Sequence, residues 1–223
     1  MGPMFQFNQE LVFLWGLRLA VLFICLPVHE FAHAWAAHKL GDDTAARQGR
    51  LTLNPFVHLD LFGGLLILLA GFGWAKPVPV NAGVFRHPRR DMAVVAAAGP
   101  LANIIMAIIM MSAVRIIANA VPAGSAFPVA GAVQVLITML SINLVLAAFN
   151  LLPVPPLDGS KLLGALLPER LYFSMMRYER FVMLALIALV FTGTLIRPIF
   201  WLRDHLFTFV YFITTPIDMI FGR

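Results

Sequence analysis

The chain has 223 residues, of which 61% are apolar and 12% charged, and its 16 Lys and Arg against 11 Asp and Glu give a net charge of +5. A water-soluble domain is nearer half apolar and a quarter charged, so these proportions exclude an ordinary soluble protein and a disordered chain, and a lone cysteine excludes a disulfide scaffold. The positive charge does not indicate a nucleic-acid partner, because the basic residues stand between apolar runs, as they do in membrane proteins.

Apolar runs along the chain predict an all-α, polytopic membrane protein. A helix needs about 20 residues to cross the ~30 Å apolar core of a bilayer. The runs that reach this length, the last with its flanks included, are residues 11–28, 92–114, 127–152 and 181–196. Residues 59–73, which contain several glycines, and residues 199–217, which are interrupted by Arg203, Asp204 and His205, are ambiguous. We therefore expect about five to six transmembrane helices.

The first apolar run leads into His29-Glu30-Phe31-Ala32-His33. Residues i and i+4 share one face of a helix, so both imidazoles can bind one metal ion, with Glu30 in reach of a water molecule on that ion. Bound zinc lowers the pKa of such a water to about 7 and polarises a carbonyl group, and Glu30 can take the proton of the water. The alternative is that these polar residues only mark the exit of the helix into the lipid headgroups.

The chain between the first two long runs predicts short surface elements on either side of residues 59–73. Residues 50–54 alternate between polar and apolar side chains, and residues 76–80 are interrupted by two prolines. Both patterns favour short extended β segments at the membrane surface, although a proline-rich connector has the same composition.

A catalytic zinc site has three protein ligands and one open position, so His29 and His33 require a third. The sequence Asn150-Leu151-Leu152-Pro153-Val154-Pro155-Pro156-Leu157-Asp158-Gly159 follows the third long run. Its three prolines cannot continue a helix, so the chain unwinds at the membrane edge, where it can turn a carboxylate inward. The carboxylate in this stretch is Asp158.

Together these motifs resemble the site-2 protease family, the intramembrane zinc metalloproteases. The resemblance rests on H-E-x-x-H in a membrane segment and, more than a hundred residues later, on N-x-x-P-x-x-P-x-D-G at residues 150–159. Gly99-Pro100-Leu101-Ala102-Asn103 resembles the core helix of the family, and residues 74–81 resemble a segment of its small bacterial members. The resemblance runs from about residue 28 to 161, well over half of the chain.

The resemblance implies one zinc ion per chain with His29, His33 and Asp158 as ligands, Glu30 as the general base and Asn150 as the group that positions the substrate backbone or the oxyanion. It implies an endopeptidase that cuts transmembrane segments of other membrane proteins. It also supports a surface strand that binds the unwound substrate, because a helical substrate buries its scissile amide.

The expected organisation is a single integral-membrane domain over residues 1–223, with a catalytic core at about 11–165 and C-terminal helices at about 178–220. The sequence has no long polar insertion that accommodates the PDZ or CBS domain of larger members. Small size and the resemblance indicate a bacterial cell membrane. The expected partners are a transmembrane protein substrate and the lipid bilayer, with no nucleic acid.

Charges and metal ligands together predict the topology. Residues 118–126, between the second and third long runs, carry no charge, so we expect them on the outer side of the membrane. The metal ligands, which follow the first and third runs, then lie near the cytoplasmic face. Residues 59–73 must enter and leave by that same face, so we expect this segment to be re-entrant.

Two other functions fit part of the pattern. A divalent-metal transporter also places His and Asp in the membrane, but it needs a path of further polar residues, which the outer halves of the long runs lack. A non-catalytic membrane scaffold would keep the fold and discard the chemistry, whereas Glu30 is present. Asn103 and Asn143, within the second and third runs, either line the cavity or form hydrogen bonds between helices.

Overall fold

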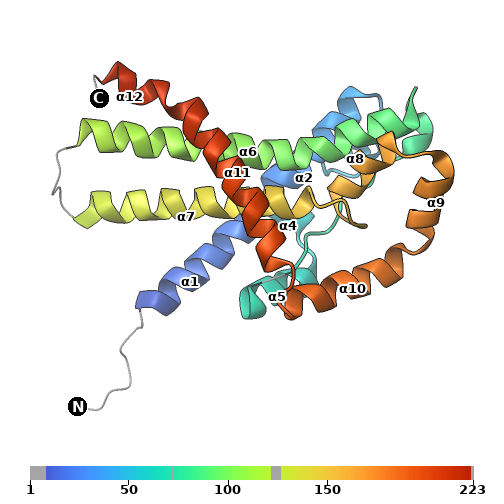
Figure 1. Ribbon diagram of the computed structural model, residues 1–223, viewed down its shortest axis with the longest axis horizontal. Coiled ribbons are helices and arrows are strands. Elements are labelled where there is room, and N and C mark those ends of the chain that lie inside the picture. Colours follow the sequence, from blue (N-terminus) through green and yellow to red (C-terminus); the bar gives the residue numbers. More distant parts are fainter. Residues whose placement is uncertain (1–8, 72, 122–126, 222–223) are drawn as a thin grey trace, which may run out of the picture.

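The computed structural model describes residues 9–71, 73–121 and 127–221, and within them every regular element is a helix. Two of the longest helices, α6 (Pro88–Ala120) and α7 (Phe127–Asn150), lie side by side, and α2 (Leu26–Lys39) packs against α6 (Figure 1). Among the described residues, three helices are long and apolar enough to cross a membrane: Leu11–Lys39, Pro88–Ala120 and Val129–Asn150. The chain is therefore a membrane protein.

The first of these helices is continuous but changes its hydrogen-bonding pattern just before the His motif. α1 (Gln9–Ala20) passes through the π-helical turn η1 (Val21–Cys25) into α2, and the N–H of Leu26 bonds to the carbonyl of Val21, five residues back. Pro27 follows at once and has no N–H to donate, so a regular α-helical ladder is interrupted here in any case. Such π turns are frequent at functional sites.

The C-terminal part of the chain differs from the expected arrangement. Residues 181–196 are predicted to span, but α10 (Glu179–Phe191) has 13 residues, about 20 Å at 1.5 Å per residue. Gly193, with φ +73°, turns the chain, and α11 (Ile196–Thr214) leaves at a bend of 85°. The two helices form at most one broken span, so the described residues contain three candidate spans, or four, and the expected five to six are not confirmed.

Short elements connect the first two long helices: α3 (Thr44–Arg47), α4 (Pro55–His58), α5 (Leu61–Ala70) and η2 (Ala82–Val84). The apolar α5 has 10 residues, about 15 Å, which is half the thickness of a bilayer core and suits a re-entrant segment. Arg18 of α1 donates to the carbonyl oxygens of Leu68 and Leu69, at the end of this helix. Residues 73–81 form neither a helix nor a paired strand, so the expected β segment is not confirmed.

Further helices follow the third long one. α8 (Asp158–Leu166) packs against α6, α9 (Glu169–Arg177) leads to α10, and α12 (Pro216–Ile220) lies beside the end of α6 (Figure 1). There Arg115 of α6 pairs with Asp218 of α12, and its Nε donates to Thr214 over 3.0 Å. These contacts tie the C-terminal helices to the bundle.

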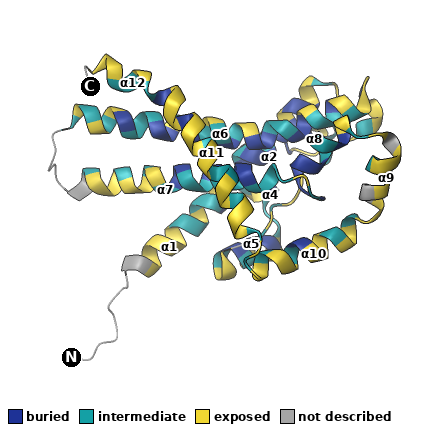
Figure 2. Ribbon diagram, in the orientation of Figure 1, coloured by how far each residue is buried: buried dark blue, intermediate teal, exposed yellow. Residues whose placement is uncertain are grey.

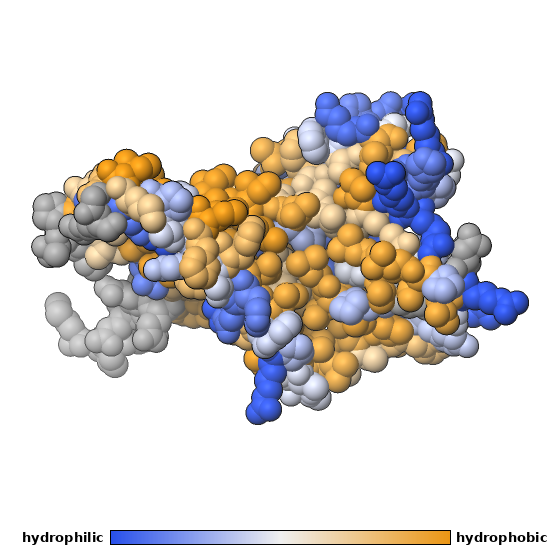
Figure 3. Space-filling view, turned by 45° about the horizontal axis from the view of Figure 1, so that its top comes forward, coloured by the Kyte–Doolittle hydropathy of each residue, from blue (hydrophilic) through white to orange (hydrophobic). Residues whose placement is uncertain are grey.

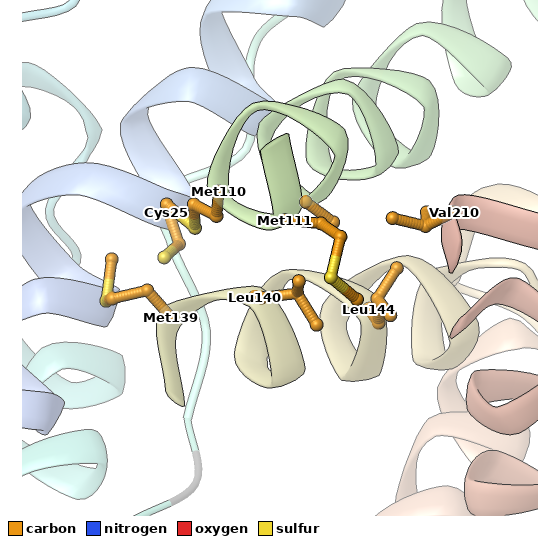
Figure 4. Packing of buried hydrophobic residues seen from close by; sticks show 8 residues of the cluster. Cys25, Met110, Met111, Met139, Leu140, Leu144 and Val210 are labelled. Atoms are coloured by element: carbon orange, nitrogen blue, oxygen red, sulfur yellow. The ribbon is translucent and has the colours of Figure 1, made fainter. Parts of the chain in front are cut away.

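The buried core joins η1, α6, α7 and α11. Its side chains, which are apolar and rich in methionine (Figure 4), are Cys25, Ala107, Met110, Met111, Met139, Leu140, Leu144 and Val210. Exposed residues predominate on the outward surfaces of the helices (Figure 2), where large apolar side chains such as Phe181 and Phe212 are about 70% exposed. Hydrophobic residues cover the middle of the molecule, and hydrophilic residues gather toward the end that holds α8 and α9 (Figure 3), as expected of a surface in contact with lipid.

Candidate metal centre

The ends of two long helices bring three candidate ligands together. His29 and His33 project from α2, and Asp158 is the first residue of α8, after the loop that follows α7. Nε2 of His33 lies 3.1 Å from Nε2 of His29, and Oδ2 of Asp158 lies 3.3 Å from Nε2 of His29 and 3.1 Å from Nε2 of His33. All three side chains are buried. This convergence of side chains more than a hundred residues apart is the arrangement that the two motifs predict.

The three donor atoms fit a zinc ion. In a tetrahedral site with bonds of about 2.0–2.1 Å, neighbouring donors stand roughly 3.3 Å apart. The separations of 3.1–3.3 Å observed here match that value, and two imidazoles with one carboxylate are donors that zinc commonly takes. His29, His33 and Asp158 are therefore positioned to bind one zinc ion.

The loop before Asp158 turns back against the end of α7. Residues 151–157, which include three prolines, are not helical, as the sequence predicts. A Cβ on Gly159 would collide with the main-chain oxygens of Leu151 and Leu152, so only glycine allows this close approach. Ser160 then bonds to the carbonyl of Leu157 through its N–H (3.0 Å) and through its hydroxyl (2.7 Å). These contacts aim Asp158 at the two histidines.

Helix α6 holds the imidazole rings from the other side. Nδ1 of His33 lies 2.8 Å from the main-chain oxygen of Val95, and Nδ1 of His29 lies 2.6 Å from Oδ1 of Asn103. Gly99 of α6 faces the Nε2 atoms of both rings. A Cβ at this position would lie 2.6 Å from Nε2 of His29 and closer still to Nε2 of His33, so only glycine leaves room for the two imidazoles. The Nε2 atoms therefore face the same small space, beside a residue without a side chain.

The carboxylate of Asp158 uses its two oxygens differently. Oδ2 faces the histidines, whereas Oδ1 lies 3.5 Å from the Nζ of Lys161. Burial by itself raises the pKa of Asp158, but hydrogen bonds from His29 and His33 outweigh burial and hold that pKa well below its usual range. Asp158 is therefore ionised at neutral pH, as a metal ligand must be.

Glu30, the predicted base, is buried beside the two histidines. Its Oε2 accepts a hydrogen bond of 3.1 Å from the main-chain N–H of Val78, in the irregular segment 73–81. That segment is fixed on both sides of Val78, because the N–H of Lys76 donates to the carbonyl of His58 (2.8 Å) and the N–H of Asn81 donates to Asp42 (2.7 Å). The structure thus places a stretch of fixed, non-helical backbone next to Glu30.

Asn150, the last residue of α7, does not belong to the group of metal donors. Its Nδ2 donates to the carbonyl of Leu146, one turn back in its own helix, over 2.9 Å. An amide has two N–H groups and one oxygen, so this bond uses only part of its capacity. A role of Asn150 toward a substrate stays a prediction.

Two elements of the site are not identified by sequence reasoning: the main-chain N–H of Val78 and the role of Asn103 as partner of His29. The first has no sequence signal, since it is a backbone group placed by tertiary contacts. The role of Asn103 has a sequence signal, because this residue lies in the Gly99-Pro100 motif at membrane depth, where burying an amide is costly unless it is hydrogen-bonded.

Comparison with known proteins adds independent findings. Residues 113–193, which contain Asn150 and Asp158 but not His29 or His33, match the family described as Peptidase family M50. The chain is 44% identical over 172 residues to "Putative zinc metalloprotease YwhC" of Bacillus subtilis, covering 77% of this chain and 78% of that relative. It is 30% identical over 195 residues to "Putative zinc metalloprotease Rip2" of Mycobacterium tuberculosis, covering 81% of this chain and 70% of that relative. No solved structure matches.

Proposed function

We propose that this chain, which belongs to peptidase family M50, the site-2 protease family, and is thus a zinc metalloprotease, is an intramembrane endopeptidase. In this proposal it cuts membrane-protein substrates in or near their transmembrane segments. The observation that carries the proposal is the convergence of His29, His33 and Asp158 at the ends of apolar helices long enough to cross a membrane. A peptide bond reaches such a site only from within or beside the bilayer.

In the proposed mechanism His29, His33 and Asp158 hold the zinc ion, which when bound supplies an acidified water and polarises the scissile carbonyl. Glu30 takes the proton of the water as it attacks and later gives that proton to the leaving amine. The hydrogen bond from Val78 to Oε2 leaves Oε1 of Glu30 as the oxygen that accepts the proton. Asn150, at the end of α7, holds the substrate backbone or the oxyanion.

The substrate binds as an extended strand in this proposal, because a helix buries the scissile amide in its own hydrogen bonds. Segment 73–81 supports this part. Pro77 and Pro79 have no N–H, and the N–H groups of Lys76 and Val78 are already bonded. Residues 76–79 can therefore bond to a neighbouring strand only through carbonyl oxygens, of which that of Lys76 already accepts from Arg50. A strand bonded to these oxygens lies next to Glu30.

An apolar cavity supports the approach of a transmembrane segment. It has a volume of about 390 Å³, lies between α1, α5, α7 and the ends of α10 and α11, and is lined by residues that include Leu14, Ile67, Leu146 and Phe149. Phe149 directly precedes Asn150, so the cavity reaches the part of α7 assigned to substrate binding.

The proposed location is a bacterial cell membrane with the metal centre near the cytoplasmic face and α5 as a re-entrant segment. The uncharged connection after α6 supports this orientation, as do the hydrophilic residues at the end that holds α8 and α9 (Figure 3). The proposed catalytic core at about residues 11–165 contains every candidate ligand and the base, and the C-terminal helices at about 178–220 complete a single domain.

The test is cleavage of a single-span model substrate by the detergent-purified chain, with zinc content measured in the same samples. Wild type is expected to cleave and to carry about one zinc ion. Glu30→Gln is expected to keep zinc and to lose cleavage by about 10²–10⁴-fold, the usual contribution of a general base. The matched control is Glu179→Gln, at the start of α10 and outside the metal centre, which is expected to cleave like wild type. Full activity of Glu30→Gln, or a wild type without zinc, would refute the proposal.

A further inference from the structure

Two asparagines continue the hydrogen bonding of His29 into the membrane core. Asn103 of α6 and Asn143 of α7 are both 0% exposed. Oδ1 of Asn103 lies 2.6 Å from Nδ1 of His29, and Nδ2 of Asn103 donates to Oδ1 of Asn143 over 2.9 Å. These residues therefore form hydrogen bonds between helices, one of the two alternatives that the sequence leaves open, and their chain of bonds ends on a candidate zinc ligand.

Only one orientation of the two side-chain amides pairs every donor in this hydrogen-bonded series with an acceptor. Nδ2 of Asn143 donates to the main-chain oxygen of Met139 over 2.9 Å, and a carbonyl oxygen can only accept. Oδ1 of Asn143 must therefore face Asn103 and accept from its Nδ2. Oδ1 of Asn103 is then the atom that faces His29, and it too can only accept.

The proton of His29 is fixed as a result. Because Oδ1 of Asn103 accepts, Nδ1 of His29 must carry a proton, which leaves Nε2, on the side of Asp158, as the nitrogen that can give up its proton to bind a metal ion. The same holds for His33 by another route, because its Nδ1 faces the main-chain oxygen of Val95. The tautomer of His29 thus depends on side chains, whereas that of His33 depends on backbone.

We propose that Asn103, held in orientation by Asn143, is the positioning residue that fixes the tautomer and ring direction of His29 for metal binding. The inference rests on the proposed function in that the site must bind zinc. An acceptor on the distal nitrogen of a ligand histidine orients the ring and raises its basicity, and loss of such a partner commonly weakens metal binding 10–100-fold. Helix α7 carries Asn143 and also leads into the loop of Asp158, so it helps to position two of the three candidate ligands, His29 and Asp158.

The first test is zinc affinity of the full chain in detergent, measured by competition with a chelator. Asn103→Leu replaces the amide with an apolar side chain of similar size, which removes the acceptor for His29, and is expected to weaken zinc binding by about 10–100-fold. Asn103→Asp keeps an acceptor for His29 and is expected to bind zinc more tightly than Asn103→Leu. The matched control is Asn119→Leu, in the same helix, whose side chain bonds to Asp218 and to the carbonyl of Arg115 instead. It is expected to bind zinc like wild type.

The second test reads the proton directly, by ¹⁵N NMR of metal-free protein labelled at histidine, with His29→Gln to assign the signals. In wild type the proton of His29 is expected on Nδ1. In Asn103→Leu the His29 signals are expected to shift toward a tautomer mixture, with those of His33 unchanged. A role in packing alone would leave the tautomer of His29 unchanged.

An Nδ1 of His29 without a proton in wild type, or wild-type zinc affinity in Asn103→Leu, would overturn the inference. If Asn103→Leu does not fold, the wild-type tautomer and the affinity of Asn103→Asp decide it. A wild type that binds no zinc would refute the proposed function, while the tautomer still tests the role of Asn103 separately.

Discussion

Gly99 offers the sharpest test of the metal centre, because its replacement by alanine adds a single carbon at a known place. The new Cβ would lie 2.6 Å from Nε2 of His29 and closer to Nε2 of His33, whereas ordinary contacts of a Cβ begin near 3.4 Å. Helix α6 and the imidazoles must therefore move apart by at least about 0.8 Å. Metal sites tolerate departures of about 0.2 Å in ligand distances, so the shift is several times too large. We expect Gly99→Ala to weaken zinc binding by at least about 10–100-fold.

The control for this prediction is Gly131→Ala, in α7, where nothing lies within 4 Å of the added Cβ. Both substitutions raise helix propensity, by up to about 1 kcal/mol, so a difference between them reports the contact with the histidines alone. Zinc affinity by chelator competition and thermal unfolding of the metal-free protein are measured for both. Zinc binding by Gly99→Ala at wild-type strength would show that the Nε2 atoms do not face the space beside residue 99.

Three further predictions concern other parts of the molecule. Asp158→Ala is expected to lose zinc binding by at least about 10-fold, because a third of the ligand set is removed, and full zinc content by metal analysis would refute the assignment. Burial by itself raises the pKa of Asp42, but hydrogen bonds from Thr44 and Asn81 outweigh burial and lower that pKa. The ionised carboxylate therefore stabilises the fold at a pH above its ordinary pKa near 4, and this contribution is lost as the pH falls through the lowered pKa. Asp42→Asn should therefore lower the unfolding temperature at pH 7, and by less at pH 3; an equal effect at both would contradict the sign. Arg115→Leu is expected to cost about 2 kcal/mol, because it removes the buried partner of Asp218, and unchanged thermal unfolding would rule this out.

Each motif of the candidate ligand set was accessible from sequence because its own geometry is local, and the family resemblance joined the two motifs into one set. The spacing of His29 and His33 fixes a common helical face, and the prolines before Asp158 end a helix wherever it packs. The partner of His29 is different, since Asn103 and Asn143 meet only because of how α6 and α7 are turned against each other. Likewise, the irregular segment 73–81 is held by contacts with Asp42 and Glu30 that no periodicity reveals.

The number of spans was the least accessible property. Length and apolarity of residues 181–196 favour a straight helix across the bilayer, but hydropathy does not register a single residue such as Gly193 that takes a left-handed conformation. Once the chain turns there, the apolar side chains lie on two helices, α10 with 13 residues and α11 with 19, that meet at a bend of 85°. The same limit applies to α5, whose shortness was visible from the sequence but whose contact with Arg18 of α1 was not.

The π turn between α1 and α2 sets the angular phase between two parts of one helix. A five-residue hydrogen-bonded step accommodates one residue more than an α-helical step, and each residue corresponds to about 100° of rotation around the axis. The side chains of α1 are therefore rotated by about 100° around the helix axis, relative to those of α2, from the positions that a continuous α-helix would give them. Deleting one residue from Val21–Cys25 would restore that repeat and rotate α1 by about 100° relative to His29 and His33. Arg18 would then leave the end of α5 while the candidate metal ligands stay in place, so this short turn separates the orientation of α1 from that of α2.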